Sequence, residues 1–230
     1  MRPRVLLASL LGVGAFVATD VNAAPVTFNF NGGCLTQCWL NGPDGNSRTF
    51  NAGGISVSAT AWSFSNNGGA TSSTNDEFLG HFGGGLGVTS SSDGNGSGNK
   101  HTVDNKGRDD YIRFIFSESV SVTSIVLTRF GDTDISYLVG PNQSKPNWTN
   151  RNGPNSGGIV TRNFNGLASS TQFRLGAKFS NGNDRFKVRS ITVDYTPKQV
   201  SEPAGLALLA LGLVGLGAAA RRPQFAKTRT

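Results

Sequence analysis

The chain of 230 residues has little of what most enzymes need. It contains two histidines, two cysteines and one methionine, and charged residues make up only 15% of it. No Gly-x-Ser-x-Gly nucleophile motif occurs, and the glycine run at residues 83–87 lacks the spacing of a dinucleotide-binding loop. We therefore expect no catalytic role and no organic cofactor. Glycoside hydrolysis by paired carboxylates is the remaining enzymatic alternative.

The net charge of +7 does not indicate nucleic-acid binding, because much of it lies at the two ends of the chain. Residues 1–23 carry +1 and residues 201–230 carry +3, which leaves +3 for residues 24–200. No cluster of lysine and arginine in this central part forms a track for phosphates. A nucleic-acid partner is therefore not expected.

Helical periodicity is almost absent, whereas alternation of apolar and polar residues is frequent. Alternation is clear at residues 26–30, 55–61, 111–116, 120–127, 173–179 and 186–195. Its phase shifts at Trp62, between Val122 and Ile125, and at Ser190, as β-bulges would require. Short strands, polar turns and phase shifts predict an all-β fold, a single antiparallel β-sandwich or jelly roll at residues 24–199.

The N-terminal end has the layout of a secretory signal peptide. Arg2 and Arg4 precede the apolar residues 5–18, and Val21-Asn22-Ala23 supplies the small residues of a cleavage site. We expect cleavage after Ala23, which assigns residues 1–23 to a signal helix. The alternative is an uncleaved anchor, although an apolar run of 14 residues is short for a membrane span.

The C-terminal end contains an apolar run, residues 204–220, that consists of Ala, Gly, Leu and Val alone. As a helix of about 1.5 Å per residue it would extend roughly 25 Å, enough for a thin bilayer. The basic tail at residues 223–230 is expected on the cytoplasmic side, which positive residues favour, and the central domain on the other side. The expected sorting signal spans residues 200–222 and includes this run. The residues of its motif flank the run on both sides: Val200, Ser201, Glu202, Pro203, Arg221 and Arg222.

This arrangement resembles the PEP-CTERM sorting signal of Gram-negative bacteria, which consists of a Pro-Glu-Pro motif, a transmembrane helix and an arginine cluster. Ser201 stands where the family usually has proline. The resemblance implies an exosortase as partner, a precursor anchored in the inner membrane, and release or attachment at the cell surface. The alternative is an ordinary C-terminal membrane anchor.

A second motif lies within the central domain. Asp104-Asn105-Lys106-Gly107 leads into the aromatic strand at residues 111–116, and Asp132-Thr133-Asp134 follows. The segment, roughly residues 103–136, resembles a group of exosortase-dependent surface proteins. This resemblance implies a β-rich surface protein and attaches no reaction to it.

Five aspartates of this region are candidate ligands for Ca²⁺, because hard cations take six to eight oxygen ligands. A second candidate is a loop with EF-hand-like spacing that begins at Asp93 and reaches Asp104 at its twelfth position, although no flanking helices are predicted. The alternative is ordinary turn chemistry at Asp104-Asn105 and Gly107. The five candidate ligands are Asp104, Asp109, Asp110, Asp132 and Asp134.

The two cysteines and Trp148 complete the candidate residues. Cys34 and Cys38 are expected to form a disulfide in an oxidising compartment, since zinc needs about four ligands and neither histidine offers a matching spacing. Trp148 lies in a polar connection, residues 140–158, where it could stack on a sugar ring or anchor the connection against the domain.

Two targeting signals around a polar, loop-rich β domain predict an exported protein of the cell surface or extracellular matrix, with a structural role. The alternative is a polysaccharide-binding β-sandwich that uses Ca²⁺ and Trp148.

Overall fold

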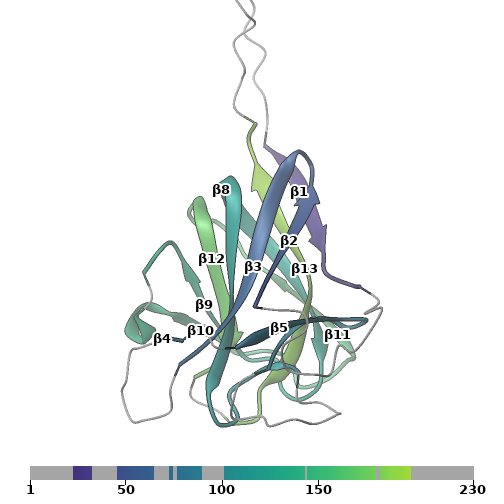
Figure 1. Ribbon diagram of the computed structural model, residues 1–230, viewed down its shortest axis with the longest axis vertical. Helices are drawn as coiled ribbons and strands as arrows, with labels where there is room; N and C mark the ends of the chain where they lie inside the picture. Colours follow the sequence, from purple (N-terminus) through teal and green to yellow (C-terminus); the bar gives the residue numbers. More distant parts are fainter. Residues whose placement is uncertain are drawn as a thin grey trace, which may run out of the picture. The chain divides into compact units, whose positions relative to one another are not determined.

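The computed structural model describes residues 23–32, 46–64, 73–74, 77–89, 101–142, 144–179 and 182–197. Within these residues lie thirteen strands and one short 3-10 helix (Figure 1), so the all-β prediction is confirmed. The helices expected at residues 1–23 and 204–220 lie outside the described residues. No helix among the residues described is long and apolar enough to cross a bilayer.

The strands follow one another along the chain as β1 (Ala24–Asn29), β2 (Ser47–Ala52), β3 (Ile55–Phe64), β4 (Ser73–Thr74), β5 (Phe78–Phe82), β6 (Gly85–Thr89), β7 (Val103–Asp104), β8 (Asp109–Arg129), β9 (Ile135–Val139), β10 (Thr149–Arg151), β11 (Ile159–Asn163), β12 (Ser170–Ala177) and β13 (Arg185–Tyr195). The 3-10 helix, η1 (Lys145–Asn147), precedes β10.

The named strands pair antiparallel in one sheet, which is continuous through β8. Residues 109–116 of β8 pair with β3, whereas residues 121–129 pair with β13. The two parts of the sheet face each other. Rings from the β1 segment contact rings of the first part of β8, at centroid distances of 5.9 Å for Phe28–Phe116 and 5.6 Å for Phe30–Phe114. The domain is therefore sandwich-like, with one main apolar core between the two parts.

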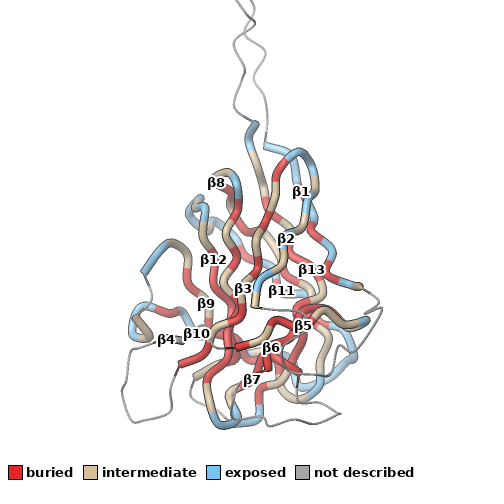
Figure 2. Tube along the Cα trace, in the orientation of Figure 1, coloured by how far each residue is buried: buried red, intermediate tan, exposed pale blue. Residues whose placement is uncertain are grey.

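Strand β3 shows why these residues fold as they do. Its core-facing residues Ile55, Val57, Ala59 and Ala61 are buried, and the intervening residues are half-buried (Figure 2). A period of two places one face of a strand against the core. Each fully buried apolar side chain of the size of Val or Phe contributes about 1.5–3 kcal/mol to stability, so this alternation fixes the register of the strand.

Two of the three predicted phase shifts are bulges in the pairing of β8 with β13. Thr123 is the extra residue on β8, between Val122 and Ser124, which both pair with β13. Arg189 is the extra residue on β13. Each bulge turns the following side chains to the other face, which is what the change of phase in the sequence indicated.

The bulge expected at Trp62 is wrong. β3 and β8 stay in register without interruption from Val57 to Phe64. The sheet is covered on both faces here, because a second apolar cluster lies on the face away from the main core. Its buried members are Phe64, Tyr111, Leu138 and Trp148, with Trp62 and Phe179 packed against them.

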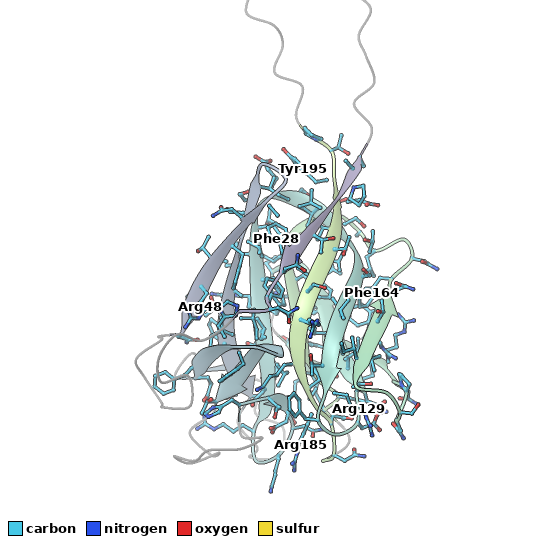
Figure 3. All side chains as sticks on the ribbon, turned by 90° about the vertical axis from the view of Figure 1, so that its right-hand side faces the viewer. Phe28, Arg48, Arg129, Phe164, Arg185 and Tyr195 are labelled. Atoms are coloured by element: carbon cyan, nitrogen blue, oxygen red, sulfur yellow. The ribbon has the colours of Figure 1, made fainter. Side chains whose placement is uncertain are left out.

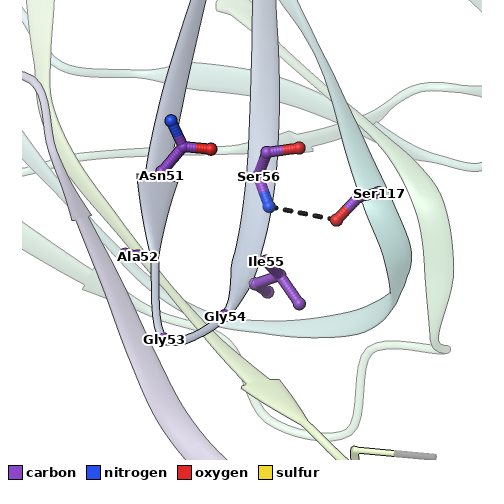
Figure 4. A pocket seen from close by; sticks show the side chains of 7 residues that line it. All are labelled: Asn51, Ala52, Gly53, Gly54, Ile55, Ser56 and Ser117. Atoms are coloured by element: carbon purple, nitrogen blue, oxygen red, sulfur yellow. Dashed lines mark hydrogen bonds between the residues drawn. The ribbon is translucent and has the colours of Figure 1, made fainter.

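A two-residue turn joins β2 to β3. Gly53 and Gly54 have φ of 54° and 79°, as in the tight hairpin turns that glycine favours. A Cβ atom on Gly53 would lie 2.5 Å from Cγ2 of Val26. The turn lines a shallow hollow of about 470 Å³ (Figure 4), where the Ser56 N–H donates to Ser117 Oγ at 3.0 Å. None of its seven lining residues is ionisable.

Strand β13 runs between the two ends of the domain. At one end Tyr195 pairs with Ala24, the first residue of β1. At the other end lie Arg129 and Arg185 (Figure 3). A strand of eleven residues spans about 33 Å. The N-terminal and C-terminal residues of the folded domain therefore lie together at one pole, and the start of β13 lies at the opposite pole.

Candidate metal centre

Three carboxylates meet at the pole where β13 begins. Asp132 and Asp134 follow the end of β8, and Asp184 directly precedes β13. Each offers one oxygen, and these oxygens lie within 4.8 Å of one another. We call this group the carboxylate cluster.

The backbone aligns the two segments that carry the cluster. Asp132 donates its N–H to the carbonyl of Asn183 at 3.0 Å, and its own carbonyl accepts from Arg185 at 2.9 Å. These bonds form a parallel bridge between Asp132 and Asp184. The approach is close, because a Cβ atom on Gly131 would lie 2.5 Å from the Asn183 carbonyl oxygen. Glycine at this position is what allows the two segments to touch.

Asp184 is the most enclosed member of the cluster. Its side chain is fully buried, its Oδ2 accepts from Asn105 Nδ2 at 3.2 Å, and its Oδ1 has no hydrogen-bond partner. Burial first, and then the negative charges of Asp134 and Asp132, raise the pKa of Asp184 to about 7. The Asp134 N–H and the Lys178 ammonium act in the opposite direction. The neighbouring positive charge does not fully offset burial and the two carboxylates, so the Asp184 carboxyl is not fully ionised at neutral pH.

Lys178 is the cation that contacts the cluster directly. Its Nζ lies 3.3 Å from Asp134 Oδ2 and donates to Asn152 Oδ1 at 2.6 Å. The other oxygen of Asp134 accepts the Gly153 N–H at 2.5 Å. One ammonium thus faces three carboxylates, and negative charge is in excess.

Two amide side chains donate to the cluster. Asn155 donates from its nitrogen to Asp132 Oδ2 at 2.7 Å, and Asn105 Nδ2 donates to Asp184. The Oδ1 of Asn105 is buried without a hydrogen-bond partner, while its nitrogen donates to the Lys178 carbonyl at 2.6 Å.

The structure brings together two of the five predicted calcium ligands, Asp132 and Asp134. The other three do not belong to the cluster. Asp109 forms an ion pair with Lys145, and Asp110 is buried in the first part of β8. Gly176 of β12 pairs with both Tyr111 and Ser136, so the start of β8 lies at the same pole as the cluster. Asp109 is nevertheless held there by Lys145 and not by the cluster.

Asp104 has the turn chemistry that the sequence offered as an alternative. Its Oδ2 accepts from Thr102 Oγ1 at 2.8 Å and its Oδ1 accepts the Lys106 N–H at 2.9 Å. Burial raises the pKa of this carboxyl, and the two hydrogen bonds oppose that effect. The EF-hand-like loop from Asp93 lies outside the described residues up to His101.

Asp184 was not among the predicted ligands. The sequence does contain a weak signal, because Gly182-Asn183-Asp184 is a turn-forming segment directly before an alternating strand. Its proximity to Asp132 depends on the pairing of β13 with β8, which no local pattern specifies.

Trp148 has the geometry of the loop-anchor alternative. It is only 6% exposed. Its ring centroid lies 5.1 Å from that of Tyr111, 5.0 Å from Phe179 and 5.9 Å from Phe64. Little of the ring surface is left for a sugar to stack on.

The other predicted site residues lie outside the described residues. These are the cysteines and the sorting motif: Cys34, Cys38, Val200, Ser201, Glu202, Pro203, Arg221 and Arg222.

The chemistry open to the cluster is the binding of a small cation. Asp134 and Asp184 are 5% and 0% exposed, so a polysaccharide chain has no access to either carboxyl group. A buried group of oxygens with excess negative charge suits a hard metal ion instead. The chain matches no protein-family model, no curated protein and no solved structure, so no relative indicates a ligand for these residues.

Proposed function

We propose that the chain is the precursor of an exported, exosortase-processed bacterial protein of the cell surface or extracellular matrix. In this proposal residues 24–199 are a jelly-roll-type β-sandwich with a structural role. The observation that supports it most is the pairing of Ala24 with Tyr195. Because β1 and β13 are neighbours, both targeting segments join the folded domain at the same pole.

The described core lies well inside the limits of the proposed mature domain. Among the described residues, the buried apolar side chains run from Val26 to Val193. Ala23 and Ala24 are exposed, as are Thr196 and Pro197. Cleavage after Ala23 and near the Glu-Pro motif would therefore keep every buried apolar residue of the described part of the chain, as processing of an already folded domain requires.

The absence of catalysis is part of the proposal. Lys145 engages Asp109, and Asp104 is held in its own turn. A glycosidase needs two carboxyl groups on either side of a substrate-accessible bond, and the buried carboxylate cluster does not offer this. The polysaccharide-binding alternative stays a prediction, for which Trp148 offers little ring surface.

Export and processing are tested by expressing the full chain in bacteria with and without an exosortase, and measuring its intact mass and its location. We expect a shorter, surface-associated product only with the exosortase. Glu202→Ala should abolish processing. Ser201→Pro restores the family motif and should increase the processed fraction, whereas the neighbouring control Gln199→Ala should leave it unchanged. An uncut chain dissolved in the cytosol, or identical products with and without the enzyme, would contradict the proposal.

A further inference from the structure

The carboxylate cluster supports one more inference. We propose that Asp132, Asp134 and Asp184 bind a calcium ion, which holds the segment after β8 against the start of β13. The site lies within the folded domain, so it does not depend on the export or processing of the chain.

The side chain of Asp184 distinguishes this cluster from an ordinary group of acidic residues. Its side chain is fully buried, and its Oδ1 has no hydrogen-bond partner. Burying a polar atom without a partner costs free energy, so native proteins almost always satisfy such atoms. One oxygen of Asp184 lies within 4.8 Å of one oxygen each of Asp132 and Asp134, so a single cation among the three would give them a shared partner.

The charge balance of the cluster also favours a divalent cation. Lys178 supplies one positive charge, at 3.3 Å from Asp134. Arg162 adds a second positive charge that Asp134 and Asp132 attract, while its guanidinium donates to the Arg151 carbonyl at 3.3 Å. Among the described residues, three carboxyl groups are thus set against two cations, which leaves room for a further positive charge. Lys178 already donates to a second acceptor, so its ammonium can leave Asp134 without losing every partner.

The ligand atoms distinguish calcium from other metals. The three members of the cluster offer carboxylate oxygens, without the imidazole or thiolate that zinc and copper prefer. Asn155 donates to Asp132 from its nitrogen and orients that carboxylate, and water can fill the remaining positions. Calcium accepts six to eight oxygens in irregular geometry, whereas magnesium needs a near-ideal octahedron and keeps several waters. A largely buried set from separate loops fits the larger ion.

The first test measures the melting temperature of the purified full chain in mild detergent, with a chelator and with roughly 2 mM calcium. Extracellular calcium modules bind with Kd of about 10⁻⁴–10⁻³ M, and at the tighter end of this range the melting temperature should rise by about 5 °C. Magnesium should give less than half of this rise. Isothermal titration should show one calcium ion per chain.

The second test localises the effect. Asp184→Asn should abolish the calcium-dependent rise, and so should Asp132→Asn, which serves if the first variant folds poorly. The matched control is Asp194→Asn, at the opposite end of β13, which should keep the full rise. The proposal is overturned if the wild-type chain gives no rise, if it responds to magnesium as strongly as to calcium, or if either cluster variant keeps the full rise. Failed processing by the exosortase would leave each of these results unchanged.

Discussion

Glu77 and Asp184 are both fully buried carboxylates, but their surroundings differ. Glu77 Oε1 accepts from Ser63 Oγ at 2.7 Å and from Arg108 Nη1 at 2.8 Å, so one carboxylate meets one guanidinium. Asp184 lies beside two further carboxylates, and a single lysine contacts the group. Buried carboxyl groups of one domain can thus have very different charge surroundings. In our proposal, this balance of neighbouring charges is what makes Asp184, and not Glu77, a metal ligand.

The largest effect is expected from breaking the ion pair between Glu77 and Arg108. Arg108→Met leaves the buried Glu77 without its guanidinium, and the free energy of unfolding should fall by about 2–3 kcal/mol in a urea titration. Lys106→Met, two residues away and exposed, should change it by less than about 0.5 kcal/mol. Both variants keep the carboxylate cluster, so calcium should stabilise each as much as it stabilises the wild type. Equal small changes in both would mean that Arg108 does not stabilise the buried Glu77.

The next prediction exchanges the carboxylates themselves, in the presence of a chelator. Glu77→Gln weakens the charge-assisted hydrogen bond with Arg108 and should lower the free energy of unfolding by about 2 kcal/mol. Asp184→Asn removes the repulsion from two neighbouring carboxylates, and should raise it by about 1 kcal/mol. The opposite signs are the test. Destabilisation by both variants would show that Asp184 is already satisfied without a metal.

Replacing the lysine of the cluster should couple stability to calcium. Lys178→Met removes the ammonium that contacts Asp134, and we expect a loss of about 1–2 kcal/mol in chelator, because three carboxylates then face one another. The same variant should show a larger calcium-dependent rise in melting temperature than the wild type, since the ion no longer competes with the ammonium. A smaller rise would show that Lys178 supports the bound ion instead of substituting for it.

The smallest effect concerns Lys187, a buried cation whose neighbours are aromatic rings instead of carboxylates. Lys187 Nζ lies 4.0 Å from the ring centroid of Phe82 and 4.9 Å from that of Phe130. Burial lowers the pKa of Lys187 from 10.5 to about 8. Between these two values the unfolded chain binds more protons than the folded chain, so the free energy of unfolding should rise with pH across this window. The rings favour the charged ammonium, so we expect a rise well below the roughly 3 kcal/mol that a shift of this size gives without them.

Lys187→Met tests the assignment of that rise. The variant should remove the increase in stability between about pH 8 and pH 10 in urea titrations, while Lys106→Met, at an exposed position, should retain it. An unchanged pH profile in the Lys187 variant would attribute the increase to another group.

Sequence patterns predicted the parts of the fold in which one strand face is apolar and the other polar. They located β1, β3, β12 and β13, and the two bulges at Thr123 and Arg189. They divided β8 into two strands, because Ser117-Glu118-Ser119 interrupts the apolar alternation where β8 passes from one part of the sheet to the other. The alternation reports which side of the chain is buried, and it does not report which strand lies alongside.

The glycine-rich strands β5 and β6 were missed for a different reason. Gly80, Gly85 and Gly87 resemble loop residues in the sequence. In the fold, a side chain at Gly87 would clash with the His101 carbonyl oxygen. Glycine here marks a close approach of two backbones, a second meaning that the residue has within strands.

The candidate site was half predictable. The spacing of Asp132 and Asp134 placed two carboxylates in one turn, but Asp184 joins them only through the pairing of strands about fifty residues apart in the sequence. Likewise, the position of Trp148 in a polar connection gave no indication that three aromatic rings would pack against it.

The length of β13 has a mechanical consequence. The strand begins next to the carboxylate cluster and ends beside the first residues of β1. The chain therefore leaves the domain after Tyr195 at the pole opposite the cluster. A molecule tethered at that pole would point the carboxylate cluster toward the surrounding medium, some 33 Å from its attachment. In the proposed processing, calcium ions in the medium would reach the carboxylate cluster equally well before and after the chain is released from its anchor.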